Sequence, residues 1–346
     1  MSSVFIKAMA SPHYGNLTYD GSHNKHMKLN PDQALQLART SILAAGASEA
    51  VAHSLAEATV AAELWGRPSV GFTHLFDYLN ALRVGRISPN AEPVVDHPVP
   101  AAVRVDACHG IAQLGFDRSF DDLVERAQRF GIAAFIQRNS YTAGELGYYT
   151  RRLAANGLVA LAASNGPALV ATGSARQAVF GTNPFSFAAP VRDSQPLLID
   201  QATSATAFVN IRAAAEKGEH IPAGWVLDAQ GIPVTDAAQA LHGLLQTFGG
   251  SRGANVSLMV EVLAAGLTGA QWSIDAPSFT DGERSPAVGL LVVTMTPQLL
   301  ADDFEVRMAT HLERLTALGV HIPGRRPARQ HIDLPDATIT ALKTTA

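Results

Sequence analysis

The spacing of apolar residues changes near residue 100, and this change limits the chain to folds that combine helices with a sheet. Between residues 31 and 84 the apolar side chains recur at helical intervals. From residue 101 to about 196, short runs with β-strand character alternate with helical segments. The predicted class is therefore α/β or α+β.

Local signals define the individual elements. Asn30 followed by Pro31 is typical of a helix start, and Gly46 of a helix end. We predict a helix from Pro31 to the residues before Gly46, two more at 48–64 and 71–84, and a proline-rich connection at 85–100. Further helices are predicted at 116–130, 254–267 and 301–318, and strands at 103–105, 132–136, 158–163, 186–189, 197–200 and 289–295.

Composition excludes several classes of protein. The chain has 26 Lys and Arg against 30 Asp and Glu, a net charge of −4, so no nucleic-acid partner is expected. The single Cys108 excludes a disulfide framework, and because the histidines lack metal-binding spacing we expect no metal. No apolar run approaches the roughly 18 to 20 residues of a membrane span. We therefore expect a cytoplasmic protein without a membrane partner.

Glycine-rich loops remain as candidate ligand sites, since neither G-x-G-x-x-G nor G-x-x-x-x-G-K-[ST] is present. A G-x-S-x-G pattern at 249–253 follows residues that we interpret as a helix end, not as the strand of a nucleophile elbow. The loops at 181–184, 248–253 and 323–326 offer backbone N–H groups and arginines to an anion. Taken singly, most such turns are only tight connections.

Taken together, these loops and other segments make the chain resemble the type 2 malate/L-lactate dehydrogenases over about residues 31–329. The segments that carry the resemblance are 69–71, 78–79, 82–87, 139–140, 144, 147–149, 181–184, 198–204, 221–225, 248–253 and 322–326. Within this family, the sequences of segments 103–108, 201–205 and 262–269 are most similar to those of the Δ1-piperideine-2-carboxylate/Δ1-pyrroline-2-carboxylate reductases.

The resemblance implies a domain organisation. Residues 30–100 would form a helical N-terminal subdomain, and 101–300 a cofactor-binding and catalytic domain on a mixed, largely antiparallel, non-Rossmann sheet. Residues 301–346 would return to the helical subdomain. The family also implies a homodimer. Residues 1–29, the first 26 of which are rich in Ser, His, Asn and Tyr without an apolar signal core, are expected to be a flexible extension.

A nicotinamide cofactor, NADPH or NADH, is implied as well. The residues expected to contact it are Ser164, Asn165, Thr182, Asp200, Ala202, Thr203, Ser204, Ser251, Arg252, Gly253, Gly324, Arg325 and Arg326. Dinucleotide phosphates attract arginines and loop N–H groups, which agrees with this set. Arg252 stands where the family has Lys and Arg325 where it has an acid, and the added positive charge favours NADPH.

The chain departs from the family at the catalytic positions. Family members carry the general-acid His where this chain has Val70, paired with the Asp that matches Asp200. A second His of some members is Thr142 here, and His74 stands where relatives usually have Arg. Neither of the family's imidazoles is therefore kept at its own place, and Val cannot transfer a proton.

The implied reaction is NAD(P)H-dependent reduction of a cyclic imino acid, Δ1-piperideine-2-carboxylate or Δ1-pyrroline-2-carboxylate, to the L-amino acid. In a first hypothesis the imine arrives protonated, Asp200 stabilises it, and Ser69 or Thr142 forms a hydrogen bond with it. In a second, His74 replaces the missing acid one helical turn after Val70, with Asp200 behind it. In a third, the chain binds the dinucleotide or an imino acid without turning it over. A malate/lactate-type 2-hydroxy acid dehydrogenase is the alternative reaction.

Each candidate also has a structural interpretation. Asp200 can cap the turn that follows its strand, and Ser69 can be the N-cap of the helix that begins near Gly71. His74 can pair with a substrate carboxylate or with solvent. Tyr148 and Tyr149 are expected to pack in the core.

Overall fold

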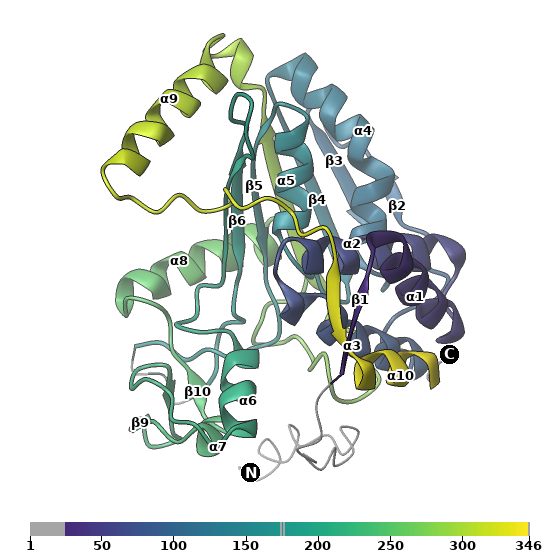
Figure 1. Cartoon of the computed structure of the whole chain (residues 1–346), viewed down its shortest axis with the longest axis vertical. Coiled ribbons are helices and arrows are strands. Elements are labelled where there is room, and N and C mark those ends of the chain that lie inside the picture. The colour runs from purple at the N-terminus through teal and green to yellow at the C-terminus, as the bar shows by residue number, and fades with distance from the viewer. Residues whose placement is uncertain (1–24, 174, 176, 345–346) are drawn as a thin grey trace.

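A computed structural model describes residues 25–344 except 174 and 176, and its centre is a seven-stranded sheet (Figure 1). The strand order is β2-β3-β4-β11-β5-β6-β7. The bounds are β2 (Val94–Asp96), β3 (Ala102–Asp106), β4 (Ile132–Ser140), β5 (Val159–Ser164), β6 (Phe185–Ala189), β7 (Leu197–Gln201) and β11 (Val288–Met295). Only β3 and β4 pair in parallel, whereas the other five pairs of neighbours are antiparallel. The predicted mixed, non-Rossmann sheet is confirmed.

Helices cover both faces of this sheet. On one face, α4 (Ala112–Phe130) and α5 (Gly147–Ala155) bury a core in which Phe116, Phe135 and Tyr149 meet edge to face (Figure 1). On the other face, α8 (Ser251–Glu261) continues into a π-helical turn, η2 (Val262–Gly266). Gly289 permits this close packing, because a Cβ there would lie 1.8 Å from the Ala264 carbonyl oxygen.

The N-terminal helices form a second unit beside the sheet. They are α1 (Pro31–Ala44), α2 (Glu49–Leu64) and α3 (Phe72–Arg83), and the short turn η1 (Pro68–Val70) joins α2 to α3. Asn30 and Gln33 form a capping box at the start of α1, and the predicted helices are confirmed within a residue or two. Their apolar faces share one core around Leu55 and Leu79.

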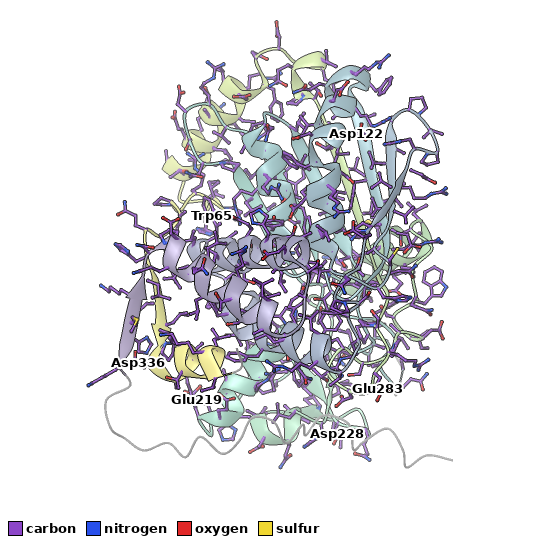
Figure 2. The ribbon with its side chains drawn as sticks, turned by 90° about the vertical axis from the view of Figure 1, so that its right-hand side faces the viewer. Trp65, Asp122, Glu219, Asp228, Glu283 and Asp336 are labelled. Atoms are coloured by element: carbon purple, nitrogen blue, oxygen red, sulfur yellow. The ribbon has the colours of Figure 1, made fainter. Side chains whose placement is uncertain are left out.

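The C-terminal residues lie against this helical unit. β12 (Ile332–Pro335) pairs with β1 (His26–Leu29), and α10 (Asp336–Thr344) packs on α1 (Figure 2). The prediction of a flexible extension is therefore wrong for residues 26–29, because they form a strand. Residues 1–24 lie outside the described part. α9 (Phe304–Ala317), by contrast, stands apart from the helical unit (Figure 1).

A small third unit lies between β7 and α8. It contains α6 (Phe208–Glu216), α7 (Ala237–Ala240) and the sheet β10-β8-β9, whose strands are β8 (Val226–Leu227), β9 (Pro233–Val234) and β10 (Leu244–Leu245). The predicted helix end before residue 249 is wrong, because β10 lies there. The connection at 85–100 contains the edge strand β2, and a 3-10 turn, η3 (Pro297–Leu299), precedes α9.

In the described part of the chain, no helix combines the length and apolarity needed to cross a membrane. Across the same residues there is no group of three or more His, Cys, Asp or Glu side chains able to hold a metal ion.

Candidate active site

Asp200 lies near the end of β7 with its side chain partly buried. Its Oδ2 accepts a hydrogen bond of 3.0 Å from the Gly147 N–H, and its backbone carbonyl accepts one of 3.4 Å from Arg67. Burial, reinforced by the nearby Glu145 carboxylate, raises the pKa of Asp200 to about 6, although the Gly147 N–H and the two arginines Arg67 and Arg151 oppose this rise. Asp200 can thus be charged or neutral near physiological pH.

A buried ion pair lies directly behind Asp200. Arg151 Nη2 is 2.7 Å from Glu145 Oε1, both side chains are nearly inaccessible, and the guanidinium stacks 4.3 Å from the ring centroid of Trp65. Figure 2 labels Trp65, which follows α2. A Cβ at Gly147 would touch Glu145, Arg151 and Asp200 at once. Asp200 is thus buried close to a second carboxylate, and both effects make it hard to ionise.

His74, on α3, faces a different carboxylate from the one predicted. Its Nδ1 lies 2.9 Å from Asp77 Oδ2 and its Nε2 lies 3.2 Å from Thr142 Oγ1. The prediction that Asp200 stands behind His74 is wrong, because Asp77 follows three residues later on the same helical face and occupies that position. The rings of Tyr78 and Phe279 enclose the imidazole edge to face.

Thr142 connects His74 to a buried phenol. Thr142 Oγ1 lies 2.6 Å from the Tyr78 hydroxyl, which also accepts a hydrogen bond of 3.2 Å from Gln113. Tyr78 in turn is 3.3 Å from the carbonyl oxygen of Thr142. Burial raises the pKa of Tyr78, so the phenol stays neutral and can both donate and accept.

Two chain segments, 67–74 and 142–147, enclose the site. At one end Arg67 and Gly147 both contact Asp200, and at the other end His74 contacts Thr142. The two segments and Asp200 therefore form a closed ring of contacts.

Ser69 and Val70 belong to one of these segments, in η1, and are partly exposed. The structural interpretation of Ser69 as the N-cap of α3 is wrong. Gly71 holds that position without a side-chain cap, and the Glu63 carboxylate accepts the Phe72 N–H at 2.9 Å instead. Ser69 is therefore not used as a cap and stays a candidate for contact with a substrate.

Several of the predicted cofactor segments converge beyond Asp200. Thr203 donates hydrogen bonds from its N–H and hydroxyl to the Thr182 carbonyl, both at 2.9 Å, and accepts one from the Phe248 N–H at 3.0 Å. Ser204 pairs with Thr247 in an isolated β-bridge. Ala202, partly buried, lies between these contacts and Asp200. The loops at 181–184, 200–204 and 247–253 thus meet at one place.

Ser164 and Asn165, at the end of β5, adjoin these loops. The Ser164 N–H donates to the Pro184 carbonyl at 3.2 Å, and Asn165 bridges Gly289 and Gln271 through its side-chain amide. Both residues are buried and have structural partners. Their side chains hold the end of β5 against Gly289 and Gln271, next to the loop cluster.

The N-terminus of α8 opens toward the same cluster. Gly249 and Gly250 have positive φ of 58° and 61°, and the N-cap Gly250 supplies no side-chain cap. Ser251 and Arg252 are exposed in the first turn, which leaves N–H groups and a guanidinium for an anion. Gly253 is essential to the loop, since a Cβ there would lie 1.8 Å from the Phe248 carbonyl oxygen.

The turn at 324–326 lies against the other end of β7. The Leu198 N–H donates to the Pro323 carbonyl, and Gly324 approaches the Leu198 backbone too closely for a Cβ. Arg325 donates to the Gln195 carbonyl at 3.3 Å, whereas Arg326 is exposed. Among the hydrogen bonds and ion pairs of the described residues, none joins this turn to the loop before α8.

The comparisons with known proteins agree with this architecture. The family model for malate/L-lactate dehydrogenase matches residues 29–337, so the chain belongs to that family. A Δ1-pyrroline-2-carboxylate/Δ1-piperideine-2-carboxylate reductase of Pseudomonas aeruginosa is 33% identical over 90% of this chain and 97% of the relative. An NADP(+)-dependent (2R)-3-sulfolactate dehydrogenase of Chromohalobacter salexigens is 35% identical over 91% of this chain and 96% of the relative.

Among solved structures, the Δ1-piperideine-2-carboxylate reductase of Pseudomonas syringae superposes with a TM-score of 0.87. It is 33% identical and covers 92% of this chain and all of its own. A dehydrogenase of Sinorhizobium meliloti gives a TM-score of 0.82 at 26% identity and covers 93% of this chain and 98% of its own. The predicted resemblance is confirmed.

Several residues of the site were not predicted from the sequence. Asp77 could have been found, because an acid three residues after a His on a helix is a recognisable pair. Glu145 and Arg151 gave no such signal, since a loop residue and a helix residue six positions apart need not meet. Arg67 and Gln113 reach the site only through the fold. Tyr149 is fully buried, and Tyr148 nearly so, as expected.

Proposed function

We propose that this chain reduces a cyclic imino acid to the corresponding L-amino acid with NADPH as the preferred cofactor. The observation that carries the proposal is the ring in which Asp200 stands opposite His74 and Thr142. Such a ring offers a carboxylate for a positively charged nitrogen on one side and exchangeable protons on the other. The names of the relatives, Δ1-pyrroline- and Δ1-piperideine-2-carboxylate reductases, support this substrate class.

The loop cluster fits a dinucleotide. Gly253 and Gly181 let the loops of this cluster pack closely on neighbouring backbone, because a Cβ at either would collide with a carbonyl oxygen. Arg252 and the first-turn N–H groups of α8 would hold phosphate, and the Thr182 and Thr203 backbone would border the ring end beside Asp200. When bound, the reduced nicotinamide would supply a hydride.

Charge near the two arginine sites favours the phosphorylated dinucleotide. Arg252 and Arg326 are exposed, and Arg325 is held at the start of β7 by its contact with Gln195. A 2′-phosphate adds negative charge that guanidinium groups bind well. The sulfolactate relative is named for NADP(+), which supports the same preference.

Asp200 would act as the anionic group for the substrate nitrogen. Because its pKa lies at about 6, it is mostly ionised at pH 7 to 8 and can stabilise an iminium by charge. The Glu145–Arg151 pair behind it holds Gly147 in place, and Gly147 fixes the carboxylate through its N–H. Ser69, partly exposed in η1, would supply a further hydrogen bond.

We also propose that two copies associate through the outer side of α8 and η2. Leu258, Met259 and Val262 are about half exposed there, and Leu267 and Trp272 extend the same region. Contiguous exposed apolar residues of this kind mark interaction surfaces. Light scattering on Leu258→Glu tests this point, since the variant should be a monomer where the native protein is a dimer.

The proposed reaction is tested by mixing the protein, NADPH and Δ1-piperideine-2-carboxylate or Δ1-pyrroline-2-carboxylate and following NADPH absorbance. Oxidation of NADPH that depends on the imino acid is the expected result. No turnover of either imine, together with reduction of 2-oxo acids such as sulfopyruvate, pyruvate or oxaloacetate, would assign the chain to 2-hydroxy acid chemistry instead. Tight NADPH binding without turnover of any of these compounds would leave only a binding role.

A further inference from the structure

The hydrogen bonds around His74 define which of its atoms can carry a mobile proton. An ionised carboxylate only accepts hydrogen bonds, so the contact with Asp77 requires a proton on Nδ1. The mobile position is therefore Nε2, which faces the Thr142 hydroxyl at 3.2 Å. The side-chain exposure of His74 is only 14%, so water has limited access to the imidazole.

The neighbouring hydroxyls can satisfy His74 in both of its protonation states. When Nε2 carries a proton it donates to Thr142 Oγ1, whose own proton goes to Tyr78, and Tyr78 donates to the Thr142 carbonyl. When Nε2 is bare, Thr142 donates to it and Tyr78 donates to Thr142 Oγ1. Gln113 donates to the phenol oxygen in either case. The change therefore costs one hydrogen bond, the one that Tyr78 donates to the Thr142 carbonyl.

The other charged and titratable groups near the pair are fixed. Tyr141 donates to the Phe279 carbonyl at 2.6 Å and lies between Asp77 and Arg86, a buried guanidinium. Burial, together with the Asp77 charge, holds the pKa of Tyr141 well above its ordinary value, so this phenol keeps its proton.

We propose that His74, oriented by Asp77, supplies a proton through the hydroxyl of Thr142 to the nitrogen of the bound imine. This inference rests on the proposed function and names the proton donor of that reaction. It places Thr142 in contact with the substrate, opposite Asp200, and makes Asp77 a positioning residue. Val70 then needs no proton-transfer role.

The step balances as follows. Once the imine carbon has accepted a hydride, the electron pair of the C=N π bond moves to nitrogen, which must take one proton. The Thr142 hydroxyl turns from Tyr78 to the substrate nitrogen, its O–H bond breaks to give that proton, and Thr142 Oγ1 takes the Nε2 proton of the imidazolium. His74 ends as a neutral imidazole whose Nδ1–H still donates to Asp77. Solvent restores the lost proton after the product leaves.

The experiment compares the pH dependence of kcat/KM for the native enzyme, His74→Gln, Thr142→Val and Thr142→Ser. At a pH where the substrate is already an iminium, no proton from the enzyme is needed, and the ratio of each variant's kcat/KM to the native value is measured there first. Two pH units higher, where the imine is neutral, His74→Gln and Thr142→Val should fall about 100-fold below the native enzyme. Thr142→Ser, which keeps the hydroxyl, should follow the native profile.

Two further variants separate the proposed role from a structural one. His97→Gln is the matched control, because His97 pairs at 2.8 Å with Asp122 of α4, and Figure 2 shows Asp122 well apart from Trp65. It should leave the profile unchanged. Asp77→Asn should lower the rate about 10-fold at high pH and shift upfield the His74 Nδ1–H proton resonance, a readout that needs no turnover.

Fluorescence titration with NADPH shows whether each variant keeps its fold and its cofactor site. Variants that bind NADPH normally and lose rate only at high pH support the inference. A His74→Gln variant whose profile parallels the native one at every pH would overturn it, and the substrate would then bring its own proton. A native enzyme inactive with all cyclic imines would instead remove the proposed function itself.

Discussion

Asp200→Asn should make the folded protein more stable at neutral pH while removing its activity. The side chain is partly buried beside Glu145, and its pKa is raised by burial and by that neighbour from an ordinary 3.8 to about 6. An asparagine keeps an oxygen that can accept the Gly147 N–H, so the 3.0 Å hydrogen bond survives. It carries no charge to bury.

The size and sign of the change in unfolding free energy follow from proton linkage. Between pH 4 and 6 the folded protein keeps a proton on Asp200 that the unfolded chain has lost, so stability falls as pH rises through this window. Above pH 6 both states are ionised and the full cost applies. At about 1.4 kcal/mol per pKa unit, the shift corresponds to about 3 kcal/mol. The variant should gain up to that amount at pH 8 and almost nothing at pH 4.

The assay is the thermal unfolding midpoint of both proteins measured from pH 4 to pH 8. Asp106→Asn is the matched control: although burial raises the pKa of Asp106, hydrogen bonds from Asn139, the Cys108 N–H and Arg138 lower it overall. This control should lose stability at pH 8, the opposite sign. If Asp200→Asn unfolded at a lower temperature than the native protein at pH 8, or by the same margin at both pH values, the reasoning would be refuted.

Three further predictions concern the surroundings of Asp200 and the loop cluster. Glu145→Gln should cost about 3 to 5 kcal/mol of unfolding free energy in urea, because it leaves the Arg151 charge buried and unpaired; a loss below 1 kcal/mol would contradict this. Gly253→Ala should weaken NADPH binding at least 10-fold in a fluorescence titration, since the added Cβ must displace the Phe248 carbonyl, and native affinity would show that the loop is not the cofactor site. Arg252→Ala should weaken NADPH binding about 10-fold and flatten its salt dependence, whereas Arg307→Ala on α9 should change neither.

The helices and most strands could be predicted because their signals are local. Asn30, Pro31 and Gln33 form the start of α1 within four residues, and the apolar runs of β5 and β11 are continuous. The two-residue strands β8, β9 and β10 are too short to show any periodicity. β1 was missed because its partner, β12, lies about 300 residues away in the sequence.

The candidate site was predictable in part. The family resemblance pointed to Asp200, His74 and Thr142, and the structure brings His74 and Thr142 into contact. It could not show that His74 turns to Asp77 and away from Asp200, because that choice depends on where α3 packs against the 142–147 loop. The raised pKa of Asp200 likewise depends on Glu145, which only the fold places behind it.

The account is tested most directly by the rate at which the purified protein oxidises NADPH with Δ1-piperideine-2-carboxylate, compared with the same protein carrying Asp200→Asn. The native protein should consume NADPH and form L-pipecolate in equal amounts. The variant, folded and still binding NADPH, should be slower by about 100-fold or more. Equal rates for the two proteins, or no reaction by the native one, would contradict the proposed chemistry at Asp200.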